Sequence, residues 1–350
     1  MSFTGLNALT FGSATIDVIG IVPDEDIERV TMTNATSSFL LLEEGRKIDV
    51  SSIKSSVGGG GTNAGVALAR LGFSTSTFVR TGNDLEGKEI VERLNAEGIK
   101  TDLIIQDANM PTGKAIMVTS HVCNPTIFTN RGANTTLVES EIDPNIFIDR
   151  HLVYIASLSG NSAACLTHIV QAAKEAGAFV ATNPGIRQLT YWAGDMVEAL
   201  PYVDLISVNA VEAEQLALTL LPKGNRIQNV PDYVDGPVLL HRGLAGRSLE
   251  VFVAEVCKLG PKIVLITNGA EGAYAGTKDG IEFYPAGKAE VGNTAGAGDS
   301  FATTFSAYAS VGSDIVTCLK AASENALSVI AAPDTHSGLL SGDDVSKAIE

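Results

Sequence analysis

Short apolar runs alternate with amphipathic stretches along most of the chain. The alternation predicts strands at 153–158, 178–183, 203–208 and 262–269, and helices at 163–176, 196–200, 300–310 and 321–331. Strand followed by helix, repeated several times, is typical of a mostly parallel sheet whose two faces are covered by helices. The sequence therefore predicts an α/β fold.

The first apolar run, residues 6–21, predicts one buried strand with Gly12 and Asp17 near its end. In open α/β sheets, ligands gather at the carboxyl ends of the strands. Asp17 is therefore well placed to accept hydrogen bonds from the hydroxyl groups of a substrate. The alternative is an ordinary polar residue in the turn at the strand end.

Two segments interrupt the alternation, at about 22–55 and 111–131. Residues 38–50 predict two short strands, and residues 112–131 are strand-like, with β-branched side chains and two candidate turns. We predict that these segments form a small sheet that stands off the main domain.

A third irregular segment, 221–247, is rich in proline and glycine and locally basic. We interpret it as a surface insertion. A regulatory contact, an oligomer contact or a basic contribution to an anion site is the alternative.

Composition excludes several classes of function. The 350 residues, 45% of them hydrophobic, are enough for one large domain or two ordinary ones. The net charge of −16 argues against nucleic acid or an anionic membrane surface as a partner. The sequence contains no apolar run long enough to span a membrane and no signal-peptide pattern, so we expect a cytoplasmic protein. Four widely spaced cysteines are expected to be reduced thiols: Cys123, Cys165, Cys257 and Cys318.

The stretch Val291–Phe301 carries the strongest chemical signal. Gly296 and Gly298 allow a tight turn and a close approach of the backbone to a ligand. The turn opens a helix, whose free N–H groups and dipole favour an anion. Asp299 lies in the first helical turn, where a carboxylate suits a base beside a phosphate under attack. On spacing alone, a glycine-rich loop with Asp299 as a helix cap is an equally good interpretation.

A second glycine run, Gly58–Gly72, leads into another predicted helix. Its glycines would let a ligand approach the backbone, and the amide of Asn63 offers both donors and an acceptor to hydroxyl groups. The alternative is a helix N-terminus capped by Thr62 or Asn63, and both interpretations can hold together.

The segment Gly82–Glu89 fits the spacing G-x-x-x-x-G-K of a phosphate-binding P-loop. The next residue should be Ser or Thr to hold magnesium, but it is Glu89, whose charge would repel phosphate. We therefore reject a P-loop at this segment.

Three of these motifs resemble the signatures of one family. The run Asn293–Asp299 resembles the C-terminal signature D-T-x-G-A-G-D of the ribokinase-like (PfkB) carbohydrate kinases, and Gly58–Gly72 resembles their N-terminal signature. Asn209-Ala-Val-Glu212 matches their N-x-x-E motif. The motifs occur in the family's order, with looser similarity between them, so the resemblance covers nearly the whole chain. It implies one ribokinase-like domain over residues 1–350, a three-layer αβα sandwich with a mostly parallel central sheet, plus a small β-sheet lid.

The resemblance also implies a reaction, transfer of the γ-phosphoryl group of ATP to a hydroxyl of a small sugar. Asp299 would accept the proton of the attacking hydroxyl, and the backbone N–H groups of Gly296, Ala297 and Gly298 would hold the charge that develops on the phosphoryl oxygens. The implied substrate-binding residues are Asp17, Gly59, Gly60, Asn63 and Asp299. The implied ATP-binding residues are Asn209, Thr267, Gly269, Gly272, Gly298 and Asn325. In the family the lid often forms the dimer contact, so we expect a homodimer.

Two further residues concern metal ions. Glu212 would organise the water shell of a Mg²⁺ ion, which usually keeps several waters. Asn293 stands where the signature usually has the Asp that contributes to a potassium site, so it is a candidate ligand and potassium activation stays open.

Two observations bear on the sugar. Gly60 replaces a lysine that some ribokinase-like enzymes carry, which argues against ribose. Relatives that act on phosphorylated sugars also lack the Asp at the position of Asn293, which favours a phosphorylated sugar. Against this, the sequence has no cluster of Lys and Arg near the sugar motifs, where Arg131 is the one basic candidate.

Three alternatives remain. A nucleoside kinase of the same fold would need a slot for a base, formed by lid residues such as Phe39 or Phe128. A non-catalytic sugar- or nucleotide-binding relative is a second, and the presence of Asp299 and Glu212 together argues against it. A dinucleotide-dependent dehydrogenase is least favoured, because no G-x-G-x-x-G follows the first strand.

Overall fold

The computed structural model describes residues 3–26, 28–31, 38–119, 126–221, 239, 243–244, 246–289 and 294–350. Within these residues, eight strands form the central sheet in the order β16-β15-β14-β13-β12-β11-β1-β6. Their bounds are β1 (Asn7–Phe11), β6 (Ser74–Phe78), β11 (Leu152–Ala156), β12 (Phe179–Asn183), β13 (Leu205–Asn209), β14 (Ile263–Thr267), β15 (Ala273–Thr277) and β16 (Gly280–Tyr284). The strands from β6 to β14 are parallel, whereas β15 and β16 are antiparallel additions at one edge.

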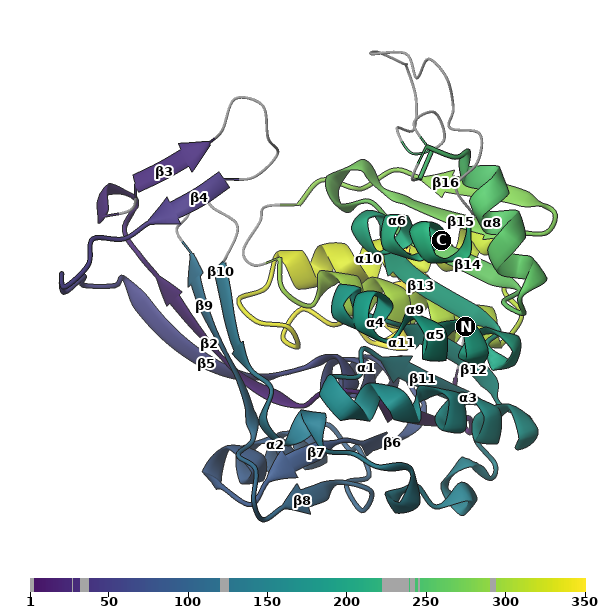
Figure 1. Ribbon diagram of the computed structural model, residues 1–350, viewed down its shortest axis with the longest axis horizontal. Helices are drawn as coiled ribbons and strands as arrows, with labels where there is room; N and C mark the ends of the chain where they lie inside the picture. The colour runs from purple at the N-terminus through teal and green to yellow at the C-terminus, as the bar shows by residue number, and fades with distance from the viewer. Residues whose placement is uncertain are drawn as a thin grey trace.

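Helices cover both faces of this sheet, as Figure 1 shows. The helices are α1 (Gly60–Leu71), α2 (Leu85–Ala96), α3 (Leu166–Glu175), α4 (Ile186–Tyr191), α5 (Ala193–Ala199), α6 (Ala210–Leu220), α8 (Leu249–Lys258), α9 (Ala297–Ser310), α10 (Ile315–Ile330) and α11 (Gly342–Ile349). Side chains alternate along each strand, so Val153 and Ile155 of β11 pack with α3, α5, α6 and α8, whereas Leu152 and Tyr154 pack with α1, α9, α10 and α11. These two cores confirm the α/β fold with three layers. The strands and helices predicted from the alternation are present, with ends that differ by a few residues.

A second sheet stands to one side of the central sheet (Figure 1). It has the order β10-β9-β2-β5, formed by β10 (Thr126–Asn130), β9 (Gly113–Thr119), β2 (Thr15–Ile21) and β5 (Ser52–Gly58). Two smaller pairs are β3 (Glu28–Thr31) with β4 (Ser38–Leu41), and β7 (Arg80–Gly82) with β8 (Ile105–Asp107). β9 and β10 lie within the segment 111–131 that we assigned to a stand-off sheet. β2 precedes the other assigned segment, 22–55, and β5 runs past its end. Of the two strands predicted at 38–50, the structure has only β4.

The single strand predicted for residues 6–21 is wrong, because the first strand ends at Phe11 and a second strand begins at Thr15. β1 belongs to the central sheet and β2 to the second sheet. Gly12 has φ 155°, and a Cβ there would lie 2.7 Å from the backbone nitrogen of Gly61. The glycine therefore lets the chain turn where it touches the start of α1.

Several expectations concern the remaining parts of the chain. Most of the predicted insertion 221–247 lies outside the described residues, as do Cys123 and Asn293. Cys165, Cys257 and Cys318 are free thiols. In the part of the chain that the structure describes, no helix is both long and apolar enough to cross a lipid bilayer.

Candidate active site

A cavity of about 290 Å³ opens at the carboxyl ends of β1 and β11, between the central sheet and the second sheet. Side chains from the second sheet line one wall, and the starts of α1 and α9 line the other. Its lining residues are Ser13, Thr15, Asp17, Gly59, Asn63, Ala115, Met117, Ile127, Thr129, Arg131, Asn134, Ser159, Ala295, Gly296, Asp299 and Thr335. We call it the acceptor cavity. It has the size of a small-molecule site and lies at the sheet edge where α/β proteins bind ligands.

Asp299 and Asn63 meet in this cavity, although they come from different helices. The Nδ2 atom of Asn63 donates a hydrogen bond to Oδ2 of Asp299 at 2.8 Å. Burial raises the pKa of Asp299, and the hydrogen bond from Asn63 acts in the opposite direction. The carboxyl group is therefore held in place with a proton affinity above its ordinary value, which suits a group that accepts a proton.

Asp17 faces the same cavity from β2. Its side chain is almost fully buried and accepts a hydrogen bond from Thr15 Oγ1 at 2.8 Å. Burial raises the pKa of Asp17, the bond from Thr15 lowers it, and the charge of Asp299 raises it further. Asp17 and Asp299, the two carboxylates predicted from the sequence, therefore line one cavity and are close enough for the charge of Asp299 to raise the pKa of Asp17.

The three glycines at the start of the first run, Gly58–Gly60, leave no room for side chains. A Cβ on Gly58 would collide with the carboxylate of Asp17, and one on Gly59, at φ 100°, would lie 2.5 Å from the carbonyl oxygen of Ser13. A Cβ on Gly60 would lie 2.8 Å from Cβ of Ala156. Because these glycines have no side chains, the start of α1 lies directly against the carboxyl ends of β1 and β11, which lead into the cavity.

α9 begins at a glycine in the left-handed region. Gly296 is the N-cap residue with φ 80°, and a Cβ there would lie 2.8 Å from Cβ of Thr335. Ala297 is the first helical residue, and Gly298 faces open space. Because Gly296 has no side chain to cap the helix, the first N–H groups of α9 are available to an anion beside Asp299.

Asn209 and Glu212 form a reciprocal capping box at the start of α6. The backbone nitrogen of Asn209 donates to Glu212 Oε2 at 2.8 Å, and the nitrogen of Glu212 donates to Asn209 Oδ1 at 3.0 Å. Burial raises the pKa of Glu212, and the charge of Asp299 also raises it, against the hydrogen bonds from the backbone. Glu212 also lines a cavity, so the capping role and a ligand role are compatible.

The residues predicted to contact ATP fall into two groups, those at strand ends and turns and the fully buried Asn325. Thr267 ends β14, next to Asn209 at the end of β13, and the turn that follows contains Gly269 at φ 56° and Gly272 at φ 122°. Asn325 is fully buried instead. It donates to Thr304 Oγ1 at 2.8 Å and accepts from the nitrogen of Leu340 at 2.9 Å. Through these two hydrogen bonds, Asn325 ties α10 to α9 and to the C-terminal loop.

A second cavity of about 350 Å³ adjoins the first and shares Arg131 and Ser159 with it. Arg131 donates to Ser159 Oγ at 2.8 Å, and Arg187 from α4 lines the same cavity. Burial lowers the pKa of Arg131, and the charge of Arg187 lowers it further. Among the described residues, neither guanidinium forms an ion pair. Two cations that form no ion pair with the described residues therefore lie beside the acceptor cavity. Glu212 lines this second cavity too, and the guanidinium of Arg187 lies over the ring of Tyr191, 5.9 Å from its centroid.

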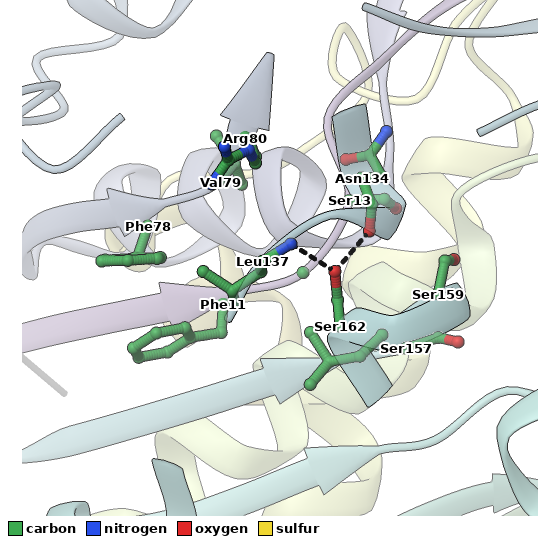
Figure 2. A pocket seen from close by; sticks show the side chains of 12 residues that line it. Phe11, Ser13, Phe78, Val79, Arg80, Asn134, Leu137, Ser157, Ser159 and Ser162 are labelled. Atoms are coloured by element: carbon green, nitrogen blue, oxygen red, sulfur yellow. Dashed lines mark hydrogen bonds between the residues drawn. The ribbon is translucent and has the colours of Figure 1, made fainter. Parts of the chain in front are cut away.

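Asn134 and Ser162 line a small hollow of about 10 Å³ behind the acceptor cavity, which has room for about one water molecule. Asn134 exchanges two hydrogen bonds with the backbone of Ala14, at 2.8 and 2.9 Å. Figure 2 shows Ser162 Oγ between the backbone nitrogen of Leu137 and the backbone oxygen of Asn134. These bonds hold the link between β1 and β2, and with it the position of Asp17.

The segment Gly82–Glu89 contains the start of α2, which differs from the starts of α1 and α9 in having a side-chain cap. Asp84 is the N-cap of α2, and its carboxylate accepts from the backbone nitrogens of Gly87 and Thr112, at 2.9 and 2.8 Å. The place where an anion would bind is filled by the protein's own carboxylate, which is consistent with our rejection of a P-loop.

The geometry agrees with comparisons to known proteins. The profile of the pfkB family of carbohydrate kinases matches residues 7–340. The chain belongs to this family. A ribokinase from Staphylococcus aureus (strain COL) is 27% identical over 274 residues, which cover 76% of this chain and 81% of that protein. A bifunctional ribokinase/ribose-5-phosphate isomerase A from Fructilactobacillus sanfranciscensis is 27% identical over 264 residues, 73% of this chain but only 43% of that longer protein.

Solved structures agree on the fold of this pfkB-family chain. The structure of Arabidopsis thaliana ribokinase complexed with ribose and ATP has a TM-score of 0.74 at 22% identity, and the alignment covers 100% of this chain and 99% of that one. The family resemblance and the ribokinase-like fold predicted from the motifs are therefore confirmed.

Sequence reasoning missed two residues of this pfkB-family site. Arg187 follows the strand that ends at Asn183, so the rule that ligands gather at strand ends could have found it. His336 contacts Asn63 from the loop after α10. No local pattern around residue 336 indicates this contact, which depends on the tertiary fold.

Proposed function

We propose that the protein transfers the γ-phosphoryl group of ATP to a hydroxyl group of a small sugar or sugar derivative. The observation that carries this proposal is the position of Asp299, on the wall of the acceptor cavity, hydrogen-bonded to Asn63 and one turn into α9. The cavity can take one small molecule, and the open start of α9 can take a phosphoryl group beside it.

The chain's own groups can divide the reaction between them. Asp17 and Asn63 would hold the acceptor, and Asp299 would accept the proton of its attacking hydroxyl. The bond from that oxygen to the γ-phosphorus forms as the bond to the bridging oxygen of ADP breaks. The N–H groups of Ala297 and Gly298 would stabilise the charge on the transferred group.

The residues present fit a Mg²⁺ ion that is held mainly by phosphate and water. Within the described residues, no three His, Cys, Asp or Glu side chains gather closely enough to hold a metal alone. Asp299 nevertheless raises the pKa of both Asp17 and Glu212, so the site has an excess of negative charge. Glu212, with Asn209, would hold water molecules of the ion, which when bound neutralises the β- and γ-phosphates. Thr267, Gly269 and Gly272 would contact the nucleotide beyond it.

The second sheet would act as a lid that excludes water from the phosphoryl group. Its face away from the acceptor cavity carries exposed apolar side chains that a second copy of the protein could cover: Ile53, Ile116 and Phe128. We therefore propose a homodimer through this sheet, which sedimentation of the purified protein would test.

The cavities favour some acceptors over others. The unpaired cations Arg131 and Arg187 favour an acceptor with a carboxylate or phosphate group. A nucleoside acceptor is the second candidate, supported by the apolar side chains Met117 and Ile127 in the acceptor cavity. Phe128, which we predicted for a base slot, lines a different cavity on the other side of the strand pair.

ADP release from Mg·ATP, measured against neutral sugars, sugar acids, sugar phosphates and nucleosides, tests this proposal. We expect one class to stimulate release, and the Arg131→Gln and Arg187→Gln variants to impair anionic acceptors more than neutral ones. Binding of ATP without stimulation by any acceptor would favour the non-catalytic alternative. Repeating the assay in potassium and in sodium salts tests the prediction for Asn293, which lies outside the described residues.

A further inference from the structure

His336 lies behind the two residues that face the acceptor. Its Nε2 atom is 2.9 Å from Oδ1 of Asn63, whose Nδ2 atom donates to Asp299 Oδ2 at 2.8 Å. The side chain of His336 is 2% exposed and that of Asn63 is 6% exposed. Three side chains from three distant segments therefore form one hydrogen-bonded line that ends at the carboxylate.

The protonation of His336 follows from this line. Burial lowers its pKa to about 4, and the charges of Arg93 and Arg70 act in the same direction, against those of Asp334 and Glu97. The ring is therefore neutral near pH 7 and carries one N–H. Because Asn63 turns its Nδ2 toward Asp299, its oxygen faces His336, so the ring proton must be on Nε2.

The main chain around His336 is fixed on both sides. Arg70 Nη1 donates to the carbonyl oxygens of His336 and Leu339, at 2.7 and 3.0 Å, and the same guanidinium pairs with Glu97. Asp334 Oδ1 accepts from the backbone nitrogen of His336 at 2.8 Å. The imidazole thus reaches Asn63 from a rigid support.

We propose that His336 is a positioning residue that fixes the amide of Asn63 with its nitrogen toward Asp299. An amide turned by 180° would place its oxygen against the carboxylate, and its NH₂ group would face His336 Nε2, so the ring would have to move its proton to Nδ1 to accept from it. The carboxylate and the Nε2–H form of the imidazole therefore favour the same amide orientation, in which Asn63 holds Oδ2 of Asp299 and leaves Oδ1 for the acceptor. This inference rests on the proposed function, because it gives Asp299 the role of base.

Three variants test the inference in the full-length protein. His336→Leu removes the donor, whereas His336→Gln can place an amide N–H near the position of Nε2. His151→Gln is the matched control, since His151 also makes one hydrogen bond, to the carbonyl oxygen of Ser310, away from the cavity. Thermal unfolding of all three shows how much each substitution affects the fold.

We expect His336→Leu to lower kcat by about 10–100-fold, as is typical when a reacting group loses its alignment. The KM for ATP should stay unchanged, and His336→Gln should recover most of kcat. Unchanged kcat in His336→Leu would overturn the inference. So would a His336→Gln variant that is folded but as slow as the Leu variant, since that result separates the donor from the activity.

A measurement without catalysis separates this inference from the proposed function. The two side-chain amide protons of Asn63 can be identified by NMR through their absence in Asn63→Asp. In His336→Leu we expect their shifts to collapse toward solvent-exposed values, and in His151→Gln to stay unchanged. Unchanged Asn63 signals in His336→Leu would overturn the inference. If no acceptor is found but the signals move, the contact stands and the kinase proposal fails alone.

Discussion

The starts of α2 and α9 have much in common: each has a glycine-rich turn, a helix and an aspartate in or next to the first turn. At α2 the aspartate is the N-cap, and its carboxylate accepts the N–H groups of Gly87 and Thr112. At α9 the N-cap is Gly296, and Asp299 lies three residues further on, where its carboxylate meets Asn63 in a cavity. A shift of three positions thus converts a stabilising cap into a free carboxylate beside an open anion site.

The two carboxyl groups differ accordingly in proton affinity. Burial tends to raise the pKa of Asp84, but the hydrogen bonds from Thr112 and Gly87 outweigh it, so that the pKa is lowered. Burial dominates at Asp299 and its pKa is raised. Hydrogen bonds donated to a carboxylate favour its charged form and lower its pKa. A carboxylate that must accept a proton receives fewer such bonds.

The largest effect should come from replacing Asp299, with a replacement of Asp84 as the comparison. We expect Asp299→Asn to lower kcat by on the order of 10²–10⁴, the usual contribution of a positioned base, with the fold intact. Asp84→Ala should leave kcat nearly unchanged. Steady-state ADP release with the best acceptor measures both, and comparable losses in the two variants would remove the distinction between the helix starts.

The second prediction concerns stability at the cap of α2. Asp84→Ala removes the cap and leaves the backbone N–H of Thr112 without its partner, so we expect the free energy of unfolding to fall by about 1–3 kcal/mol. Urea unfolding measures this value. A loss confined to kcat, without any change in the urea midpoint, would contradict the structural role of Asp84.

The third prediction separates the two glycines at the start of α9. Gly296→Ala forces a Cβ into the left-handed region and against Thr335, so it should lower the free energy of unfolding by about 1–2 kcal/mol. Gly298→Ala points into open space and should leave the urea midpoint unchanged or slightly raised. Equal destabilisation by both substitutions would mean that the geometry of Gly296 is not the limiting feature.

The smallest effect is a difference in the sign of the pH dependence. Because the pKa of Asp84 is lowered on folding, its stabilisation is present above the ordinary value of 3.8 and is lost as pH falls through the folded pKa. The pKa of Asp299 is raised, so its ionisation costs stability at neutral pH. Asp299→Asn should therefore be more stable than the unmodified protein at pH 7, and this gain should vanish below pH 3.8. Melting curves across pH 3–8 without nucleotide test it, and a destabilised Asn variant at pH 7 would reverse the sign.

Much of the fold was predictable because it depends on local periodicity. The runs at 178–183 and 203–208 are mostly apolar without a regular alternation of apolar and polar residues, as is typical of parallel strands buried on both faces, and both became strands of the central sheet. The run 6–21 was mispredicted because an apolar pattern does not register a change of sheet. Gly12 was visible in the sequence, but its contact with Gly61 is a property of the folded chain.

The site divides in the same way. Motif spacing placed Asp299 at a helix start and Asn63 in a glycine run, because those positions are set by neighbours a few residues away. The family resemblance, not local spacing, made Asn325 a candidate for ATP binding, and the hydrogen bonds of its side chain to Thr304 and Leu340 come from the tertiary fold. Arg187 lay outside the predicted set, although it follows a strand end, and only the fold shows that it lines the same cavity as Arg131.

By itself, the sequence determined the layers of the protein, the glycine turns and the identity of the chemical groups, since each follows from short-range patterns of side-chain size and polarity. Tertiary structure decided which groups meet. Asn63 and Asp299 are 236 residues apart, and Asn63 and His336 are 273 apart. No local pattern encodes a hydrogen bond across such a separation, because its partners are brought together by the order of the strands and the helices packed on them.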